Sequence, residues 1–374
     1  MKKLIRKHTL TMCLQLLFIN YSFSQLDSIF NQGVYRTFIL HLPTGYSASN
    51  QYPIVVNLHG DNSSAAQQES YSQFDNVADT KSFIVVYPNG ISGSWTINGL
   101  SDVTFISNLI DTIRTNYSCN ACLFATGMSD GGFMTYKLAC ALPQHLTAIA
   151  VVAGNMTKNL ENTCVIANGL PVMHFHGTAD PLVHYTGAVG IPAVDTTIKW
   201  WVNQNNCNTT PLFNSLPNIN VADSCTVENY FYSGGVNGSA VSFYKIINGG
   251  HTWPGAVAAP PLGFTNEDIN ASDLIGNFFQ QYCSGSVGIK ENEHAKQITI
   301  SPNPFNHITT ISFSEEQKNT SVKIINLLGK EVMTLYCVKS KQLVIEKGEM
   351  AAGIYFVQTI DEKKNIVNRK VVVE

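Results

Sequence analysis

The stretch LFATGMSDGGFMTYKLACAL, Leu123–Leu142, places a serine between glycines where an apolar segment gives way to a helix-like one. The run Leu123–Thr126 is typical of a buried strand, and residues 132–142 carry apolar side chains at helical spacing. Gly127-Met128-Ser129-Asp130-Gly131 therefore falls at a predicted strand-to-helix turn. A Gly-x-Ser-x-Gly sequence in this context is typical of a sharp turn that exposes a nucleophilic serine, although an ordinary turn is the alternative interpretation.

Apolar runs recur along the chain and alternate with helix-like segments. Most of these runs are apolar throughout, as buried parallel strands are. The alternation predicts an α/β fold with a doubly wound sheet and helices on both faces. The expected strands cover residues 34–42, 53–60, 83–90, 123–126, 148–154, 171–177 and 242–249, and the expected helices cover 103–117, 132–142, 196–204 and 271–283.

Two later segments supply the partners that a nucleophilic serine needs. A serine hydroxyl is a weak nucleophile until a base removes its proton. The segment PVMHFHGTADP places Asp180 just after a predicted strand, and VSFYKIINGGHTWPG places His251 after another. The order Ser, Asp, His is the order of the α/β-hydrolase triad, and loops at the carboxyl ends of strands hold the active sites of such sheets. We therefore predict that Asp180 orients His251, which takes the proton of Ser129.

Other residues compete for the acid and base roles. Asp195 and Asp223 are alternative acids, but neither follows a clear predicted strand. The alternative bases are His174, His176 and His184. His174 and His176 flank one residue of a predicted strand, which favours a packed position, and no further ligand cluster accompanies them that would indicate a metal site.

An acyl-transfer site also needs donors for the oxyanion. The N–H of Asp130, directly after the predicted nucleophile, is the first candidate. The segment VVNLHGDNSS supplies the second: we expect the N–H of Asp61 to serve, with Gly60 allowing the backbone to turn towards the site. A polar loop after a buried strand is the alternative interpretation.

Charge divides the chain near residues 285–297. Residues 25–289 carry 7 Lys and Arg against 16 Asp and Glu, whereas residues 290–374 carry 12 against 10 and are much richer in charge. Such a shift marks a domain boundary. The acidic middle region has no basic stripe to neutralise phosphates, which argues against a nucleic-acid partner.

The chain begins with features of a secretory signal peptide. Four basic residues precede an apolar run from Leu10 to about Ile19, and Ser22 and Ser24 fit the positions before a cleavage site at Gln25. The apolar run is too short to span a membrane, and no second segment approaches that length. We therefore predict a signal peptide over residues 1–24 and a mature chain without a transmembrane segment.

Eight cysteines lie outside the predicted signal peptide, and an exported chain is expected to form disulfides. Seven of them lie between Cys119 and Cys283. Pairing cannot be read from sequence, but Cys207–Cys225 is the best local prediction because it would close one polar loop. The pair Cys119-x-x-Cys122 has no second such pair nearby, so a structural role is favoured over a redox or metal role.

The segment after residue 297 changes to alternating apolar and polar residues separated by Gly, Pro, Asn and charge clusters. This period-2 pattern is typical of antiparallel strands with one solvated face. We predict a small β-sandwich of about seven strands over residues 298–374, after a linker at 285–297.

Four motifs in order, LHGD, GMSDGGFMTYKLAC, HGTADPLVHY and GGHTWPG, resemble the secreted esterases that include polyhydroxybutyrate depolymerases and feruloyl and acetylxylan esterases. The resemblance runs from about Val34 to Cys283. It implies an α/β-hydrolase fold over residues 25–284, carboxylic-ester hydrolysis without a cofactor or metal, and catalytic roles for Ser129, Asp180 and His251. It also implies Asp61 and Asp130 as oxyanion donors.

The same resemblance indicates Trp95, Trp253 and His59 near the substrate, with a core position as the alternative for each tryptophan. The chain departs from the family at Asp61, where relatives often carry a cysteine. A disulfide partner is then missing, which fits the odd number of seven cysteines in this region.

The tail motifs ISPNPFNHITTISF, VKIINLLGKEV and GIYFVQT resemble the C-terminal sorting domain of the type IX secretion system. The resemblance implies export by that machinery, with cleavage of the tail, to an extracellular or cell-surface location. Together the two resemblances predict a secreted serine esterase acting on polyhydroxyalkanoate or on feruloyl or acetyl polysaccharide esters. A serine peptidase on the same fold and a non-catalytic polysaccharide-binding protein are the alternatives.

Overall fold

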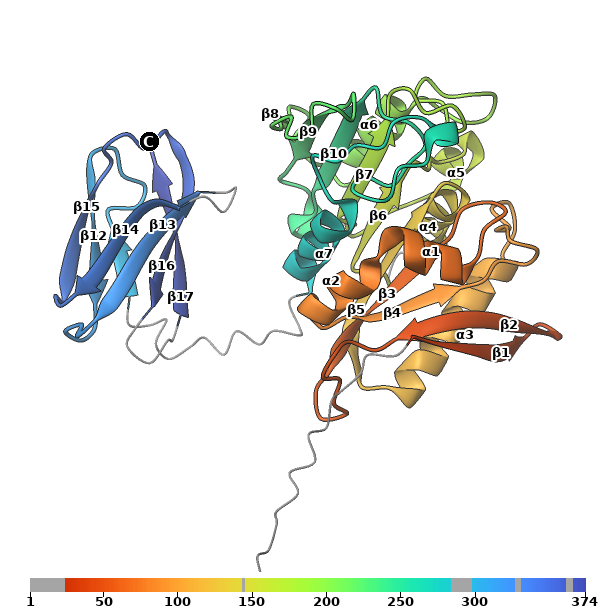
Figure 1. Cartoon of the computed structure of the whole chain (residues 1–374), viewed down its shortest axis with the longest axis horizontal. Coiled ribbons are helices and arrows are strands. Elements are labelled where there is room, and N and C mark those ends of the chain that lie inside the picture. Colours follow the sequence, from red (N-terminus) through yellow and green to blue (C-terminus); the bar gives the residue numbers. More distant parts are fainter. Residues whose placement is uncertain (1–23, 143–144, 284–297, 327–330, 361–365) are drawn as a thin grey trace, which may run out of the picture. The chain divides into compact units, whose positions relative to one another are not determined.

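A ten-stranded sheet in the order β1-β2-β4-β3-β5-β6-β7-β10-β9-β8 organises the first part of the chain (Figure 1). From β4 to β10 the neighbouring strands are parallel, and the strands outside them are antiparallel. The strands are β1 (Ser24–Asn31), β2 (Val34–His41), β3 (Tyr52–Leu58), β4 (Ile84–Pro88), β5 (Cys119–Met128), β6 (Ala148–Val152), β7 (Val172–Gly177), β8 (Leu212–Ser215), β9 (Thr226–Tyr232) and β10 (Val241–Ile247).

This computed structural model describes residues 24–142, 145–283, 298–326, 331–360 and 366–374. The chain divides into two compact units, residues 1–286 and 287–374, and each is described by itself. The predicted linker 285–297, and all of the predicted signal peptide except Ser24, lie outside the described residues.

Helices cover both faces of the sheet, because the central strands bury side chains on both sides. In β3, Val56 belongs to a core cluster with residues of α3, α4 and α6, whereas its neighbour Val55 belongs to a second cluster with residues of α1, α2 and α7. The helices are α1 (Ala65–Ser72), α2 (Phe74–Lys81), α3 (Ser101–Asn116), α4 (Asp130–Ala141), α5 (Lys158–Thr163), α6 (Val194–Gln204) and α7 (Ala271–Tyr282), with short 3-10 helices at η1 (Val236–Gly238) and η2 (Pro260–Leu262). The architecture confirms the predicted α/β-hydrolase fold.

Two antiparallel sheets form the second unit, with strand orders β11-β12-β15 and β14-β13-β16-β17. Ile311 and Ile345 of the first sheet share one core cluster with Val322 and Val357 of the second. The predicted all-β tail domain is therefore present. Its strands are β11 (Ile298–Ser301), β12 (Ile308–Phe313), β13 (Thr320–Asn326), β14 (Glu331–Val338), β15 (Gln342–Glu346), β16 (Gly353–Ile360) and β17 (Ile366–Val373).

Two disulfides tie the first unit together, Cys122–Cys283 and Cys140–Cys164. The predicted Cys207–Cys225 bridge is wrong: both thiols are free and buried, and they belong to different core clusters. Cys119 is also free, so its Cys-x-x-Cys neighbour serves a structural crosslink. In the part of the chain that the structure describes, no helix has the length and hydropathy needed to cross a bilayer.

Candidate active site

Ser129 occupies a sharp turn between β5 and α4. Its backbone has φ 55° and ψ −120°, a region that residues other than glycine rarely adopt. The Ser129 N–H donates to the Val152 carbonyl of β6 (3.0 Å), and the Ser129 carbonyl accepts the N–H groups of Gly132 and Phe133 (2.8 and 3.0 Å). Hydrogen bonds on both sides therefore hold the strained residue in place.

The glycines around Ser129 are required by close packing. A Cβ at Gly131 would lie 2.2 Å from the Leu58 carbonyl oxygen, and a Cβ at Gly127 would lie 2.5 Å from the Gly131 carbonyl oxygen. A Cβ at Gly132 would lie 2.9 Å from the Gly154 Cα. Contacts below 3.0 Å with backbone cannot be relieved by rotating a side chain, so only glycine lets the first turn of α4 pack against the ends of β3 and β6.

Asp180 and His251 form a buried hydrogen-bonded pair. Asp180 follows the end of β7, His251 follows the end of β10, and β7 and β10 are parallel neighbours. His251 Nδ1 lies 2.8 Å from Asp180 Oδ2, and each residue is 3% exposed. Asp180 Oδ1 accepts the backbone N–H groups of Leu182 and Val183, each at 2.9 Å. These donors fix the orientation of the carboxylate.

Glycines let the two loops that carry this pair cross each other. A Cβ at Gly177 would lie 2.2 Å from the Gly249 carbonyl oxygen, and a Cβ at Gly250 would lie 2.2 Å from the Leu262 carbonyl oxygen. Gly250, directly before His251, therefore serves a close backbone approach, and the His251 N–H is fixed by its bond to Leu262 O (2.7 Å).

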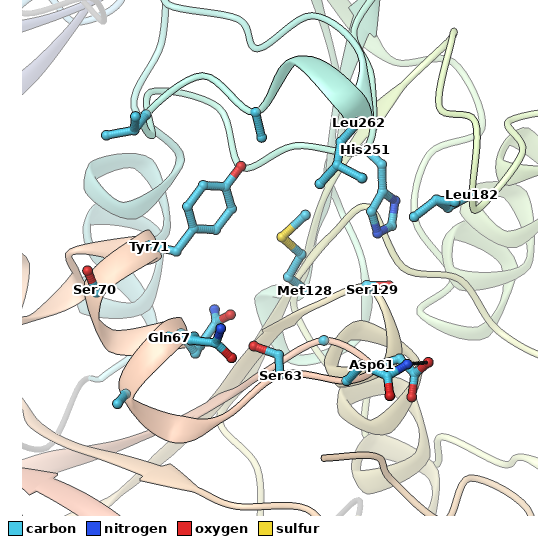
Figure 2. A pocket seen from close by; sticks show the side chains of 16 residues that line it. Asp61, Ser63, Gln67, Ser70, Tyr71, Met128, Ser129, Leu182, His251 and Leu262 are labelled. Carbon is cyan, nitrogen blue, oxygen red and sulfur yellow. Dashed lines mark hydrogen bonds between the residues drawn. The ribbon is translucent and has the colours of Figure 1, made fainter.

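Ser129 and His251 both line a pocket of about 780 Å³. Figure 2 shows the His251 ring directed towards Ser129. Asp180, which contacts His251 Nδ1, does not line the pocket. The pocket has a polar side built by the segment after β3 and by α1, and an apolar side. The polar side includes Asp61, Asn62, Ser63, Gln67, Ser70 and Tyr71, and the apolar side includes Met128, Leu182, Val257, Ala259 and Leu262.

The segment after β3 passes directly over the serine. A Cβ at Gly60 would lie 3.3 Å from Ser129 Cβ and 3.9 Å from Ser129 Oγ, so the backbone between Gly60 and Asp61 borders the hydroxyl. Asp130 is the first residue of α4, and the first N–H groups of a helix have no acceptor within the helix. Both predicted donors thus lie beside Ser129 in the chain or in space.

The carboxylates of these two residues have partners on the segment after β4. Asp61 accepts the hydroxyl of Ser94, and Asp130 Oδ2 accepts the Trp95 N–H (2.8 Å). Burial raises the pKa of Asp130, and the negative charges of Asp61 and Asp102 add to the rise, while the Trp95 N–H opposes it.

The three predicted substrate contacts lie inside the protein and do not line the pocket. Trp253 is 1% exposed, and its Nε1 donates to Ser272 Oγ (3.0 Å). Trp95 packs on His59, with ring centroids 4.8 Å apart, and its Nε1 donates to the His59 carbonyl (2.8 Å). His59 is fully buried, and its Nε2 accepts the Gly90 N–H (2.9 Å). Trp95 and His59 therefore support the segment that leads to Gly60.

The competing acids and bases do not line the pocket. Asp195 is exposed and accepts the Tyr185 hydroxyl, while Asp223 accepts the N–H groups of Cys225 and Glu267. His174, His176 and His184 do not line the pocket. No cluster of three or more His, Cys, Asp or Glu with metal-binding geometry occurs in the described ranges of the chain.

Sequence reasoning missed most of the pocket wall. Leu182 follows Asp180 by two residues and could have been inferred from that position. Gln67, Ser70 and Tyr71 lie on α1, a helix of mostly polar sequence without a clear apolar stripe, so no periodic signal marked it.

The fold and this site together define the class: an α/β-hydrolase with a serine, a histidine and an aspartate assembled at the carboxyl ends of the sheet strands. Among curated proteins, the chain is 28% identical over 162 residues to the bifunctional acetylxylan esterase/xylanase XynS20E of Neocallimastix patriciarum, covering 42% of this chain and 23% of that one. It is 29% identical over 161 residues to the probable feruloyl esterase C of Aspergillus terreus, covering 41% of this chain and 58% of that one.

It is also 28% identical over 240 residues to feruloyl esterase B of Piromyces equi, covering 58% of this chain and 42% of that one. The chain thus spans less than two thirds of each of these relatives. Among solved structures, the acetyl xylan esterase from Aspergillus awamori aligns with a TM-score of 0.47 at 16% identity, covering 61% of this chain and 94% of that one. The feruloyl esterase module of Clostridium thermocellum aligns with a TM-score of 0.47 at 15% identity, covering 70% and 88%.

Residues 299–374 match the model of the secretion system C-terminal sorting domain. Disulfides persist in oxidising compartments and are rare in the cytosol. The sorting-domain match and the two disulfides of the first unit are therefore consistent with an extracellular or cell-surface location.

Proposed function

We propose that the protein is a secreted serine carboxylic-ester hydrolase that works through Ser129, His251 and Asp180. The observation that carries this proposal is the 2.8 Å bond between His251 Nδ1 and Asp180 Oδ2, behind a pocket in which Ser129 lies on a strained strand-to-helix turn. In this proposal Asp180 accepts from His251 Nδ1 and orients the imidazole, so that Nε2 of His251 serves as the base for the serine hydroxyl.

In the proposed reaction, Ser129 Oγ attacks the ester carbonyl while His251 Nε2 takes the hydroxyl proton. The tetrahedral intermediate collapses, the C–O bond to the alcohol breaks, and His251 gives its proton to the departing alkoxide. Water then attacks the acyl-enzyme with the same histidine as base, which releases the acid and restores Ser129. The N–H groups of Asp61 and Asp130 are proposed to bind the oxyanion in both steps.

Feruloyl or acetyl esters of polysaccharides are the proposed substrates. The curated relatives carry the names acetylxylan esterase and feruloyl esterase, which favours these over polyhydroxyalkanoate. The pocket has an apolar side for an acyl group and a polar side, with amides and hydroxyls, for a sugar alcohol. Among the described residues, no Lys or Arg lines this pocket and Asp61 contributes a carboxylate to it, so the pocket suits uncharged esters.

The C-terminal unit is proposed to direct export through the type IX secretion machinery. The match over residues 299–374 supports this role. In this proposal the unit takes no part in catalysis, since the serine, histidine and aspartate all belong to the first unit.

The proposal is tested by turnover of p-nitrophenyl acetate, methyl ferulate, acetylated xylan and polyhydroxybutyrate by the full chain and its Ser129→Ala variant. We expect Ser129→Ala to lower turnover by about a thousandfold or more. Ser215→Ala is the matched control, because Ser215 is exposed on β8, does not line the pocket and should leave turnover unchanged. Faster turnover of acetylated xylan than of polyhydroxybutyrate would favour polysaccharide esters as substrates, and the reverse would favour polyhydroxyalkanoate.

Two outcomes would favour the other candidate functions. Cleavage of peptide substrates in preference to all esters would indicate a serine peptidase. Absence of turnover together with failure of a fluorophosphonate probe to label Ser129 in the folded protein would indicate a non-catalytic binding protein.

A further inference from the structure

A row of three buried polar rings lies behind the acid of the proposed triad. Tyr136 comes from α4, and His174 and His176 come from β7. The Tyr136 hydroxyl lies 2.7 Å from His174 Nδ1, and His174 Nε2 lies 3.2 Å from His176 Nδ1. Their exposed fractions are 0%, 0% and 1%. None of them lines the pocket, and the proposed reaction does not use them.

The contact of His176 with the Val183 carbonyl favours one arrangement of protons in this row. His176 Nε2 lies 2.8 Å from the Val183 carbonyl oxygen and 3.5 Å from Asp180 Oδ2. Both are acceptors, so Nε2 must carry the proton. Burial lowers the pKa of His176 and lowers that of His174 well below 6.5, so both rings are neutral.

The rest of the row follows from that first assignment. Nδ1 of a neutral His176 carries no proton and accepts a hydrogen bond from the His174 Nε2–H. Nδ1 of His174 is then bare in turn and accepts the Tyr136 hydroxyl. The row is therefore directional: every donor points towards Val183 and Asp180.

The last ring of the row, His176, contacts the segment that holds the carboxylate of Asp180. The Val183 carbonyl accepts from His176, and the Val183 N–H donates to Asp180 Oδ1 at 2.9 Å. His251 lies on the same carboxylate oxygen, Oδ2, that faces His176. We infer that His176 is a positioning residue that holds the Asp180–Val183 segment, and with it the orientation of His251, while His174 and Tyr136 hold the proton arrangement of His176.

Packing alone does not account for three polar rings at this place. Two imidazoles inside a sheet strand carry the cost of removing their nitrogens from water, which apolar residues of similar size would avoid. The neighbouring residues of β7, Val172, Met173 and Phe175, are apolar and buried. The polar side chains are retained where they connect through hydrogen bonds to the acid.

The inference rests on the proposed function, so its test uses a reaction that depends on an activated serine but not on substrate identity. The rate at which a fluorophosphonate labels Ser129 is measured for the full chain, alongside kcat and KM for p-nitrophenyl acetate. His176→Leu removes the donor, whereas His176→Gln retains an N–H near the position of Nε2. Because displacements of about 1 Å at a reacting group cost up to about a hundredfold, we expect His176→Leu to lower the labelling rate and kcat by roughly 10- to 100-fold with little change in KM.

His176→Gln is expected to restore most of the loss, which a role in packing alone would not predict. Tyr136→Phe removes one oxygen atom and keeps the fold available if His176→Leu does not fold. It should lower the labelling rate only several-fold, because the Val183 carbonyl still selects the tautomer of His176. Nitrogen-15 spectra should show His174 and His176 of the parent as neutral rings protonated at Nε2.

Labelling of His176→Leu and Tyr136→Phe at the parent rate would overturn the inference while leaving the proposed function intact. Equal losses in His176→Leu and His176→Gln would overturn it too, since only the donor distinguishes them. A folded parent that the probe does not label would overturn the proposed function, and this inference with it.

Discussion

His251 Nδ1 and Asp180 Oδ2 lie 2.8 Å apart although 71 residues separate them in the sequence. The parallel pairing of β7 with β10 brings their two loops to the same edge of the sheet. Gly177 then lets its loop approach the Gly249 carbonyl oxygen, and Gly250 lets the other loop approach the Leu262 carbonyl oxygen, at distances that a Cβ would block. The pair therefore depends on the sheet order and on two glycines as much as on its own chemistry.

Asp180→Asn should preserve the fold and remove most of the activity. Asparagine keeps the shape, but its amide cannot act as an anion that fixes the imidazole with Nε2 free, so we expect ester turnover to fall by about 10³- to 10⁴-fold. The measurement is kcat for p-nitrophenyl acetate. Asp195→Asn is the control, because Asp195 is exposed and bonds Tyr185 instead. Equal effects of the two substitutions would contradict the assignment of Asp180.

The glycine-serine turn and both partner loops were predictable because each is a local pattern. An apolar run that ends in glycines and a reactive side chain marks the carboxyl end of a buried strand, as at Ser129, Asp180 and His251. For the same reason, most ends of the parallel strands were predicted to within two residues. Helices α1, α2 and α5 were missed, because all three are short and α1 has no apolar stripe.

The disulfides and the buried positions of Trp95 and Trp253 could not be predicted in the same way. Cys122 and Cys283 are 161 residues apart, and only the packing of α7 beside β5 brings them together. Trp253 follows His251 by two residues, yet it turns into the core on the other side of the loop. Which way a loop side chain points depends on tertiary contacts that no sequence period records.

Gly131→Ala and Gly60→Ala should separate folding from catalysis. A Cβ at Gly131 would lie 2.2 Å from backbone oxygen, and we expect a loss of about 3 kcal/mol or more in the free energy of unfolding. A Cβ at Gly60 would lie 3.3 Å from Ser129 Cβ, so the fold should survive while the methyl group hinders the hydroxyl. Thermal unfolding and the fluorophosphonate labelling rate measure the two effects. A stable Gly131→Ala protein would contradict the packing described for α4.

Loss of the Cys122–Cys283 bridge should destabilise the first unit far more than loss of a free thiol. The bridge closes a long loop, and removal of such a crosslink costs about 2–5 kcal/mol. We expect Cys283→Ser to lower the melting temperature clearly and Cys119→Ser to change it little, since Cys119 is unpaired. Mass spectrometry of the non-reduced protein should detect Cys140–Cys164 as the second crosslink. A Cys207–Cys225 crosslink would contradict the structure.

Stability should decrease as the pH falls below about 6.5, partly because of His174 and His176. Burial lowers the pKa of both rings in the folded protein, whereas the unfolded chain binds their protons near the usual value of 6.5. Below that pH the unfolded state gains protons that the folded state does not, which costs up to about 1.4 kcal/mol per pH unit for each ring. Urea unfolding at pH 7, 6 and 5 measures the slope of the free energy of unfolding against pH. His174→Gln should reduce it, His184→Gln should not, and an unchanged slope in the first variant would contradict a neutral buried His174.

The charge of Asp61 should select against anionic esters. Asp61 lines the pocket beside Ser129, and in the described part of the chain no Lys or Arg lines that pocket to balance the charge. We expect the ratio of kcat/KM for p-nitrophenyl hydrogen succinate over p-nitrophenyl butyrate to rise about threefold or more in Asp61→Asn, because unit charges a few Å apart near a surface interact by about 1 kcal/mol or more. Added salt should reduce the difference in this ratio between the parent and Asp61→Asn. Asp111→Asn removes an exposed carboxylate of α3 that does not line the pocket, and it should leave the ratio unchanged. A ratio that Asp61→Asn does not move would mean that the carboxylate does not face the acyl group.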